Sequence, residues 1–205
     1  MTDFRLLKTV TAVCLATAQL LAFTDANDSR QALADESSAT ERPLSKSGPK
    51  AGTTIHPFFV RAVTGPHRNR SVCYVCRYGA RPVVMVLIQK VDPKIGDLLT
   101  SIDKVIDENR VSGLRGFGVL VTDESSRAVP ILQTIAFDEK VHMPLTAATT
   151  AIAGASSHNL HRDAATTIIL YRDQKAVQAI PLKTGQITPK EVTRIRERIT
   201  KFIRR

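Results

Sequence analysis

The residues from Pro82 to Ile88, PVVMVLI, form an apolar run with no polar interruption. Such a run is typical of a β-strand that is covered on both faces, as in a parallel or mixed sheet. A sheet covered on both faces needs helices above and below it, because each face must be buried by another layer. The run therefore restricts the chain to an α/β fold.

The residues after this strand predict a helix and a second strand. Asp92-Pro93 supplies an N-cap followed by proline at the first helical position. Apolar residues then recur at helical spacing at Ile95, Leu98, Leu99, Ile102, Val105 and Ile106. The glycines from Gly113 to Gly116 end this helix, and residues 117–121 predict another buried strand.

The rest of the domain predicts shorter elements around these two strands. A short strand is expected at 58–63, and a helix over about 129–140, because Pro130 fits a helix only in its first turn. Residues 141–146 predict a brief strand interrupted by Pro144, and residues 147–157 show no assignable pattern. The strands at 166–171 and 176–182 are spaced as a hairpin. Thr188-Pro189-Lys190-Glu191 matches a capping box that opens a final helix ending at Ile203.

The N-terminal region divides into two segments before the domain. Residues 1–26 combine a short basic start with an apolar run that is too short for a membrane span, so they predict a signal peptide. Cys14 lies in this apolar run and is expected to be removed with the signal. Residues 27–54 have the composition of a disordered linker, and residues 55–205 have the length of one domain. We therefore expect an exported protein, periplasmic or secreted.

Cys73 and Cys76 form a C-x-x-C pair that directly precedes the apolar strand. An exported chain meets an oxidising environment, where a disulfide between them is permitted. The pair lies among Arg68, Arg70, Arg77 and Arg81, and no carboxylate occurs from Gly65 to Lys90. Nearby cations lower the pKa of a thiol, so Arg70 and Arg77 are the residues that we expect to tune the pair.

The chain resembles the redoxin and peroxiredoxin-like exported bacterial branch of the thioredoxin superfamily, on FFVRAVTG, GARPVVMVLI and TTIILYRDQKAVQAI. The resemblance covers roughly residues 58–203. It implies a three-layer α/β sandwich whose central mixed sheet has helices on both faces. It also implies activities based on reactive cysteines.

Two departures separate the chain from that family. The family places its reactive cysteine at the start of the first helix after the central strand, where this chain has Val91-Asp92-Pro93-Lys94. The family's cis-proline before the hairpin is matched by Ala164-Ala165-Thr166. The usual active-site position therefore lacks its cysteine, and the C-x-x-C pair is displaced from it.

The cysteine pair has three possible roles. It is either a redox dithiol for thiol-disulfide exchange with a protein partner, or a structural disulfide in a non-catalytic binding or scaffold domain, and the sequence favours neither of these over the other. A zinc site needs about four ligands, and only His56 and His67 are near in sequence, so it is the least favoured role. Arg77 stands where a c-type haem motif needs histidine, and no cofactor is expected.

Two further groups of residues have modest implications. His158 and His161 precede the hairpin, and we expect them to be solvated in a loop at the far end of the sheet from the cysteines. Residues 190–205 hold seven basic residues against two acidic ones, within a net charge of +10. Scarce aromatics and export argue against nucleic-acid binding. This basic helix has two interpretations. The functional one is weak contact with an anionic surface, and the simpler one is an ordinary helix face exposed to solvent.

Overall fold

A computed structural model describes residues 44–154 and 156–204, and in them the chain folds around one mixed sheet. Its seven strands lie in the order β2-β1-β5-β4-β3-β6-β7. Strands β3, β4 and β5 are parallel, and the other neighbouring strands pair antiparallel. The strands are β1 (Val60–Ala62), β2 (Ser71–Val72), β3 (Val83–Ile88), β4 (Arg115–Val121), β5 (Leu145–Ala148), β6 (Thr166–Arg172) and β7 (Lys175–Leu182).

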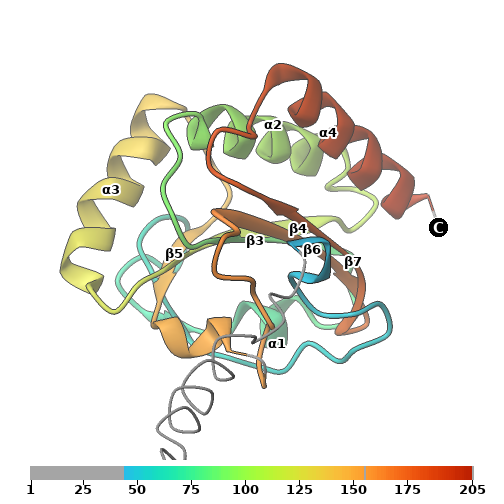
Figure 1. The fold of residues 1–205 in the computed structure, drawn as a ribbon, viewed down its shortest axis with the longest axis horizontal. Coiled ribbons are helices and arrows are strands. Elements are labelled where there is room, and N and C mark those ends of the chain that lie inside the picture. Colours follow the sequence, from blue (N-terminus) through green and yellow to red (C-terminus); the bar gives the residue numbers. More distant parts are fainter. Residues whose placement is uncertain (1–43, 155, 205) are drawn as a thin grey trace, which may run out of the picture. The chain divides into compact units, whose positions relative to one another are not determined.

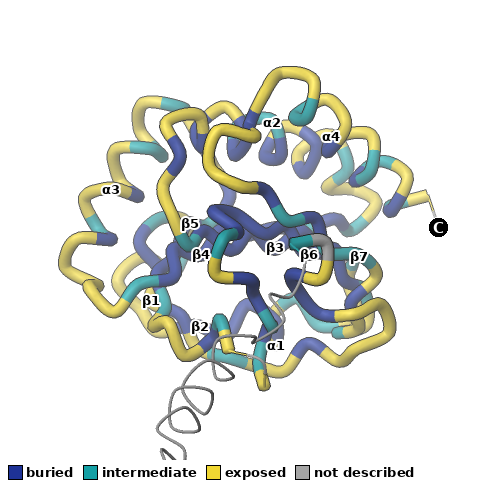
Figure 2. The backbone as a smooth tube through the Cα atoms, viewed as in Figure 1, coloured by how far each residue is buried: buried dark blue, intermediate teal, exposed yellow. Residues whose placement is uncertain are grey.

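Helices cover both faces of this sheet, so the predicted three-layer α/β sandwich is confirmed (Figure 1). Helices α2 (Ile95–Glu108), α3 (Ser125–Asp138) and α4 (Pro189–Ile203) contribute side chains to one hydrophobic cluster. The short helix α1 (Tyr74–Tyr78) contributes to a second cluster on the other face. The buried sheet runs between them through the centre of the molecule (Figure 2).

The apolar run in β3 is explained by these two clusters. Val84, Val86 and Ile88 belong to the cluster under α2 and α4, and the alternate residues Val83, Met85 and Leu87 belong to the cluster under α1. Successive side chains of a strand point to opposite faces, so a strand buried on both faces has no position left for a polar residue. All six residues of β3 are buried, as predicted.

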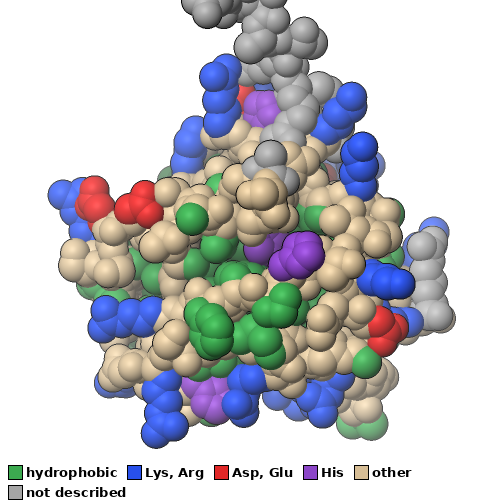
Figure 3. Space-filling model, turned by 90° about the horizontal axis from the view of Figure 1, so that it is seen from below, with side chains coloured by type: hydrophobic (Ala, Val, Ile, Leu, Met, Phe, Trp, Pro, Cys, Tyr) green, Lys and Arg blue, Asp and Glu red, His purple; other side chains and the backbone are tan. Residues whose placement is uncertain are grey.

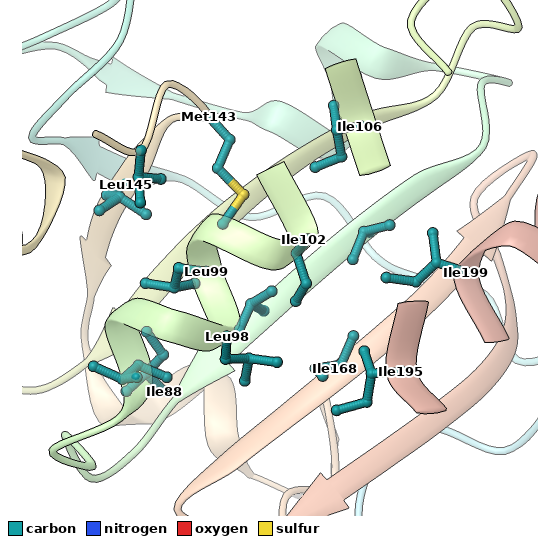
Figure 4. Close-up of a cluster of buried hydrophobic side chains, with 14 of the residues drawn as sticks. Ile88, Leu98, Leu99, Ile102, Ile106, Met143, Leu145, Ile168, Ile195 and Ile199 are labelled. Carbon is teal, nitrogen blue, oxygen red and sulfur yellow. The ribbon is translucent and has the colours of Figure 1, made fainter. Parts of the chain in front are cut away.

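The larger cluster is built mainly by α2 and α4 on the sheet (Figure 4). Leu98, Leu99 and Ile102 of α2 pack in this cluster with Ile195 and Ile199 of α4, on the same face of the strands. The capping box that predicts α4 is confirmed, because the Thr188 side chain accepts a hydrogen bond from the Glu191 N–H at 3.3 Å. Burial of this apolar surface supplies most of the free energy that holds the helices on the sheet.

The hairpin of β6 and β7 turns through two residues with positive φ, Asp173 at 50° and Gln174 at 57°. Two consecutive residues of this kind form the turn whose twist matches an antiparallel hairpin. The guanidinium of Arg172, at the end of β6, donates to the carbonyls of Phe202 and Ile203 at 3.3 Å. This contact satisfies carbonyl groups at the last turn of α4, which have no partner inside the helix.

Two helices begin at other residues than the sequence predicts. Helix α2 begins at Ile95 with Lys94 as its N-cap, so Asp92 lies two residues outside it. Helix α3 begins at Ser125, which places Pro130 in its interior rather than its first turn. Pro130 and Ser126 are both exposed, so water can hydrate the Ser126 carbonyl that proline cannot pair.

The region after α3 contains a strand and a turn of 3-10 helix. Pro144 does not interrupt a strand here, because β5 begins after it at Leu145. The 3-10 helix Thr150–Ala153 follows, in the part that shows no assignable pattern in the sequence. Among the described residues, no helix has both the length and the hydropathy that a membrane span needs.

Residues 44–54 pack on the domain, although their composition predicts a linker. The Ser47 hydroxyl accepts the His161 backbone N–H at 2.8 Å, and the Gly52 N–H bonds to the Ala176 carbonyl at 2.7 Å. Thr54 forms a bridge with Lys175 at the start of β7. The predicted boundary at residue 54 is thus too late, because backbone pairing needs no apolar side chains. The predicted signal peptide and residues 27–43 of the linker lie outside the described residues.

Candidate functional site

The basic segment around the cysteine pair, residues 68–81, contains regular structure. After β2, Cys73 is the N-cap of α1, and its sulfur accepts the Cys76 backbone N–H at 3.1 Å. The helix ends at Gly79, whose N–H bonds to the Val75 carbonyl and whose φ is +55°. A φ of this sign favours glycine, so Gly79 lets the chain leave the helix and enter β3.

Cys73 and Cys76 are joined in a disulfide, with the sulfurs 2.13 Å apart and the Cα atoms 5.4 Å apart. The two cysteines differ in exposure: Cys73 is 6% exposed and belongs to the core cluster under α1, whereas Cys76 is exposed. A thiolate in solution can therefore approach Cys76 more readily than Cys73.

Aromatic side chains hold α1 against the sheet. Tyr74 stacks on Phe117 of β4 with the ring centroids 5.1 Å apart and the planes at 23°. The Tyr78 hydroxyl donates to the Gly116 carbonyl at 3.3 Å. Val75 is fully buried between them. These contacts fix the buried side of α1 and leave Cys76 and Arg77 on its exposed side.

Burial raises the pKa values of the tyrosines on α1. Desolvation raises the pKa of Tyr74, and Arg77 opposes this shift in part. Desolvation also raises the pKa of Tyr78, with Tyr74 adding to the shift. Both phenols stay protonated at neutral pH. The Tyr74 hydroxyl is buried and has no hydrogen-bond partner among the described residues, so its burial is a cost that the ring packing must offset.

The predicted tuning residues lie beside the disulfide on the surface. Arg70 precedes β2, and Arg77 follows Cys76 in α1. Both side chains are exposed. Tuning of the cysteine thiols by Arg70 and Arg77 stays a prediction, because disulfide-bonded cysteines do not titrate.

The family's usual catalytic position, at the start of α2, holds a structural carboxylate. Asp92 is 2% exposed, and its two oxygens accept the Lys94 N–H at 2.9 Å and the Gly185 N–H at 2.6 Å. Ala165 precedes β6 where the family has a cis-proline, and the described residues contain no cis peptide bond. The Cys73–Cys76 bridge lies on the opposite face of the sheet from α2.

His158 and His161 are buried, so the prediction of solvated side chains is wrong. Their exposures are 2% and 5%. His158 Nδ1 lies 2.9 Å from the Ile152 carbonyl, which makes it the protonated nitrogen, and burial lowers the pKa of His158. Its ring meets Phe58 edge-on at 4.8 Å, and Phe58 in turn contacts Phe117. The HNLH pattern offered no sign of this burial, because it depends on aromatic residues distant in the sequence.

Among the described residues, one group of side chains has the spacing of metal ligands, namely Asp103, Asp107 and His142. However, both oxygens of Asp103 already accept backbone N–H groups, from His142 at 2.7 Å and from Met143 at 2.9 Å. Asp107 pairs with Arg110. These contacts give the carboxylates a structural role at the entry to β5. Zinc binds cysteine as a thiolate, whereas the sulfurs of Cys73 and Cys76 are bonded to each other in a disulfide.

No family model matches the sequence, and no curated protein does. Solved structures share the fold. A putative protein disulfide isomerase from Bacteroides thetaiotaomicron has a TM-score of 0.59 at 13% identity, covering 78% of this chain and 94% of its own. A putative thiol:disulfide interchange protein DsbE from Chlorobium tepidum has a TM-score of 0.55 at 9% identity, covering 75% and 98%. The peroxidoxin BcpB from Mycobacterium tuberculosis has a TM-score of 0.52 at 13% identity, covering 76% and 96%. The fold is therefore thioredoxin-like.

Proposed function

We propose that this thioredoxin-like protein carries out thiol-disulfide exchange through Cys73 and Cys76, with the sulfur of the exposed residue Cys76 as the atom that a partner attacks. The observation that carries the proposal is the difference in burial within one bridge. The sulfur of Cys73 lies in the core beside a backbone N–H donor, and Cys76 lies at the surface. One sulfur can receive a nucleophile while the other is held in place as the leaving group.

The exchange has two steps. A partner thiolate attacks Cys76 Sγ, the Cys73–Cys76 bond breaks, and its electron pair leaves on Cys73 as a thiolate. The Cys76 N–H, already 3.1 Å from Cys73 Sγ, can donate to that charge. A second thiolate of the partner then attacks the partner's own sulfur in the mixed disulfide and releases Cys76. The partner dithiol is oxidised to a disulfide, and this protein is reduced to a dithiol.

The rival function is a binding or scaffold domain with a structural disulfide. It is supported by the burial of Cys73 in the core cluster and by the absence of cysteine at the start of α2. Against it stands the small loop that the bridge closes, since the cysteines are three residues apart. On the chain-entropy model, so short a loop stabilises the fold by only about 2 kcal/mol. A bridge with one exposed residue and a small structural effect is better suited to exchange.

The proposed setting is an oxidising compartment outside the cytoplasm. A disulfide persists where thiols are not kept reduced. The neighbours named for disulfide interchange have the same fold, and the predicted signal peptide supports export. We therefore propose that the protein acts after export, in the periplasm or outside the cell, on the thiols or disulfides of another protein.

Single-cysteine variants test the proposed exchange. Cys73→Ser and Cys76→Ser should both lose exchange with a model protein dithiol, measured as its oxidation, while they keep the fold, as judged by circular dichroism. They should differ in trapping: Cys73→Ser leaves the exposed Cys76, which forms a mixed disulfide with an activated thiol reagent much faster than the buried cysteine of Cys76→Ser. Full activity in either variant would refute the dithiol mechanism.

A further inference from the structure

The residues from Leu44 to Lys90 contain no aspartate or glutamate. They contain eight basic residues, namely Lys46, Lys50, Arg61, Arg68, Arg70, Arg77, Arg81 and Lys90. All eight side chains are exposed, and within the described part of the chain none of them forms an ion pair. Every aspartate and glutamate of the described residues therefore lies after Lys90.

This basic segment includes α1 with the disulfide, and also β2 and β3, which precede and follow α1 in the chain. Figure 3 looks onto the α1 side of the sheet, where Lys and Arg side chains surround a centre of hydrophobic side chains and histidine, and acidic side chains are few. Arg77 adjoins Cys76 in the chain, and Arg70 lies three residues before Cys73. At moderate salt the Debye length is roughly 10 Å, so exposed charges this near the bridge in the chain act on a partner only at short range.

Helix α4 is also basic, but its charges are arranged differently. Glu191 and Glu197 interrupt the series, and Arg194 pairs with Glu191 at 3.6 Å. Arg196 pairs with Glu108 of α2 at 3.7 Å. Partial neutralisation of this kind weakens the field that a helix presents to an anion. The α1 side has no such compensation from its own segment.

We infer that the partner of the disulfide is a protein that presents its reacting thiol on an acidic segment. This inference rests on the proposed exchange at Cys76. A field of one sign around a reactive atom raises the local concentration of oppositely charged partners and speeds their association. An acidic peptide with a thiol fits better than an anionic polymer or lipid, because the exposed Cys76 in this basic segment belongs to a disulfide, with which a polymer or lipid head group does not exchange.

The test measures the rate at which the Cys73–Cys76 disulfide of the full chain is reduced by three reagents. Two are dithiol peptides of equal length, one flanked by glutamates and one by lysines, and the third is neutral dithiothreitol. At low ionic strength the acidic peptide should react at least about tenfold faster than the basic peptide. The ratio should approach one above about 0.5 M salt, where the Debye length is only a few ångströms.

A charge-reversal pair locates the effect on the molecule. Arg70→Glu with Arg77→Glu should bring the ratio of acidic to basic peptide rates close to one or below it. The matched control is Lys190→Glu with Lys201→Glu, which makes the same change in net charge on exposed positions of α4 and should leave the ratio unchanged. An equal loss in both double variants would overturn the inference, since it would make net charge the cause.

The three reagents separate this inference from the proposed function. If dithiothreitol reduces the bridge and the two peptides react equally fast at low salt, the acidic partner is refuted and the exchange stands. If none of the reagents reduces the folded protein, the exchange fails and the inference falls with it. A third outcome is that the two peptides react equally fast and the protein binds phosphatidylglycerol vesicles, with this binding lost in the double variant Arg70→Glu with Arg77→Glu. That outcome would assign the basic side to a membrane surface and overturn the inference.

Discussion

The start of α1 and the start of α2 lie on opposite faces of one sheet and hold different groups at a helix entry. At α1 a cysteine sulfur accepts a backbone N–H, and its partner cysteine is exposed. At α2 a buried carboxylate, that of Asp92, accepts two backbone N–H groups and ties the helix entry to Gly185. The resemblance to the thioredoxin superfamily implies redox chemistry at the second position, whereas the cysteines among the described residues lie only at the first.

The difference shows that one helix entry of this fold can serve structure while another carries a disulfide. At α2 the Asp92 carboxylate satisfies two backbone N–H groups. The α1 entry is built by aromatic packing and carries a bond that can be broken chemically. The comparison predicts that changes at α2 affect stability and changes at α1 affect exchange.

The largest effect on stability is expected at Asp92. Asp92→Ala removes the acceptor of two backbone N–H groups, and it should lower the free energy of unfolding by about 2 kcal/mol or more. The matched control is Asp97→Ala, an exposed residue in the first turn of the same helix, which should change it by less than about 0.5 kcal/mol. Urea unfolding measures both. The comparison would be broken if Asp92→Ala kept full stability and lost thiol exchange.

A somewhat smaller effect is expected from opening the bridge. Double substitution Cys73→Ala with Cys76→Ala should lower the free energy of unfolding by about 2 kcal/mol at most, because the closed loop is short. Wild-type protein reduced by a phosphine should unfold thermally at the same midpoint as this double variant. A loss of about 5 kcal/mol or more, or unfolding on reduction, would make the bridge structural and favour the binding-domain function.

The fold could be predicted from the sequence where local signals agree with packing. β3 is confirmed because its uninterrupted apolar run has one physical explanation, and α4 is confirmed because cap, proline and apolar stripe all agree. The predicted start of helix α3 is too late, since water at the exposed Ser126 carbonyl lowers the cost of an internal proline. Residues 44–54 were assigned to the linker because pairing through backbone groups leaves no trace in composition.

The site was only partly predictable. The spacing of Cys73 and Cys76 indicates a possible disulfide, and the disulfide is present. Which cysteine is exposed could not be predicted, because it depends on Tyr74 packing against Phe117, more than forty residues away in the sequence. The burial of His158 depends on Phe58 in the same way. Long-range contacts of this kind become visible only when the sheet has brought the segments together.

The smallest effect concerns His158 and the pH dependence of stability. Burial lowers the pKa of His158 in the folded protein, so the unfolded chain takes up a proton first as the pH falls. The contribution of the neutral ring is full above the unfolded pKa of about 6.5 and declines as the pH falls below it. His158→Asn keeps an N–H for the Ile152 carbonyl and should flatten this decline. His142→Asn, at an exposed position, is the matched control, and an unchanged slope in His158→Asn would refute the assignment.

The reduction potential of the Cys73–Cys76 bridge tests the central claim most directly. Thiols are counted by mass spectrometry after the protein is equilibrated in glutathione buffers of graded ratio. Exchange at Cys76 predicts a potential within the range of thiol-disulfide oxidoreductases, roughly −270 to −120 mV. A value below about −300 mV would mark a structural bridge and contradict the account.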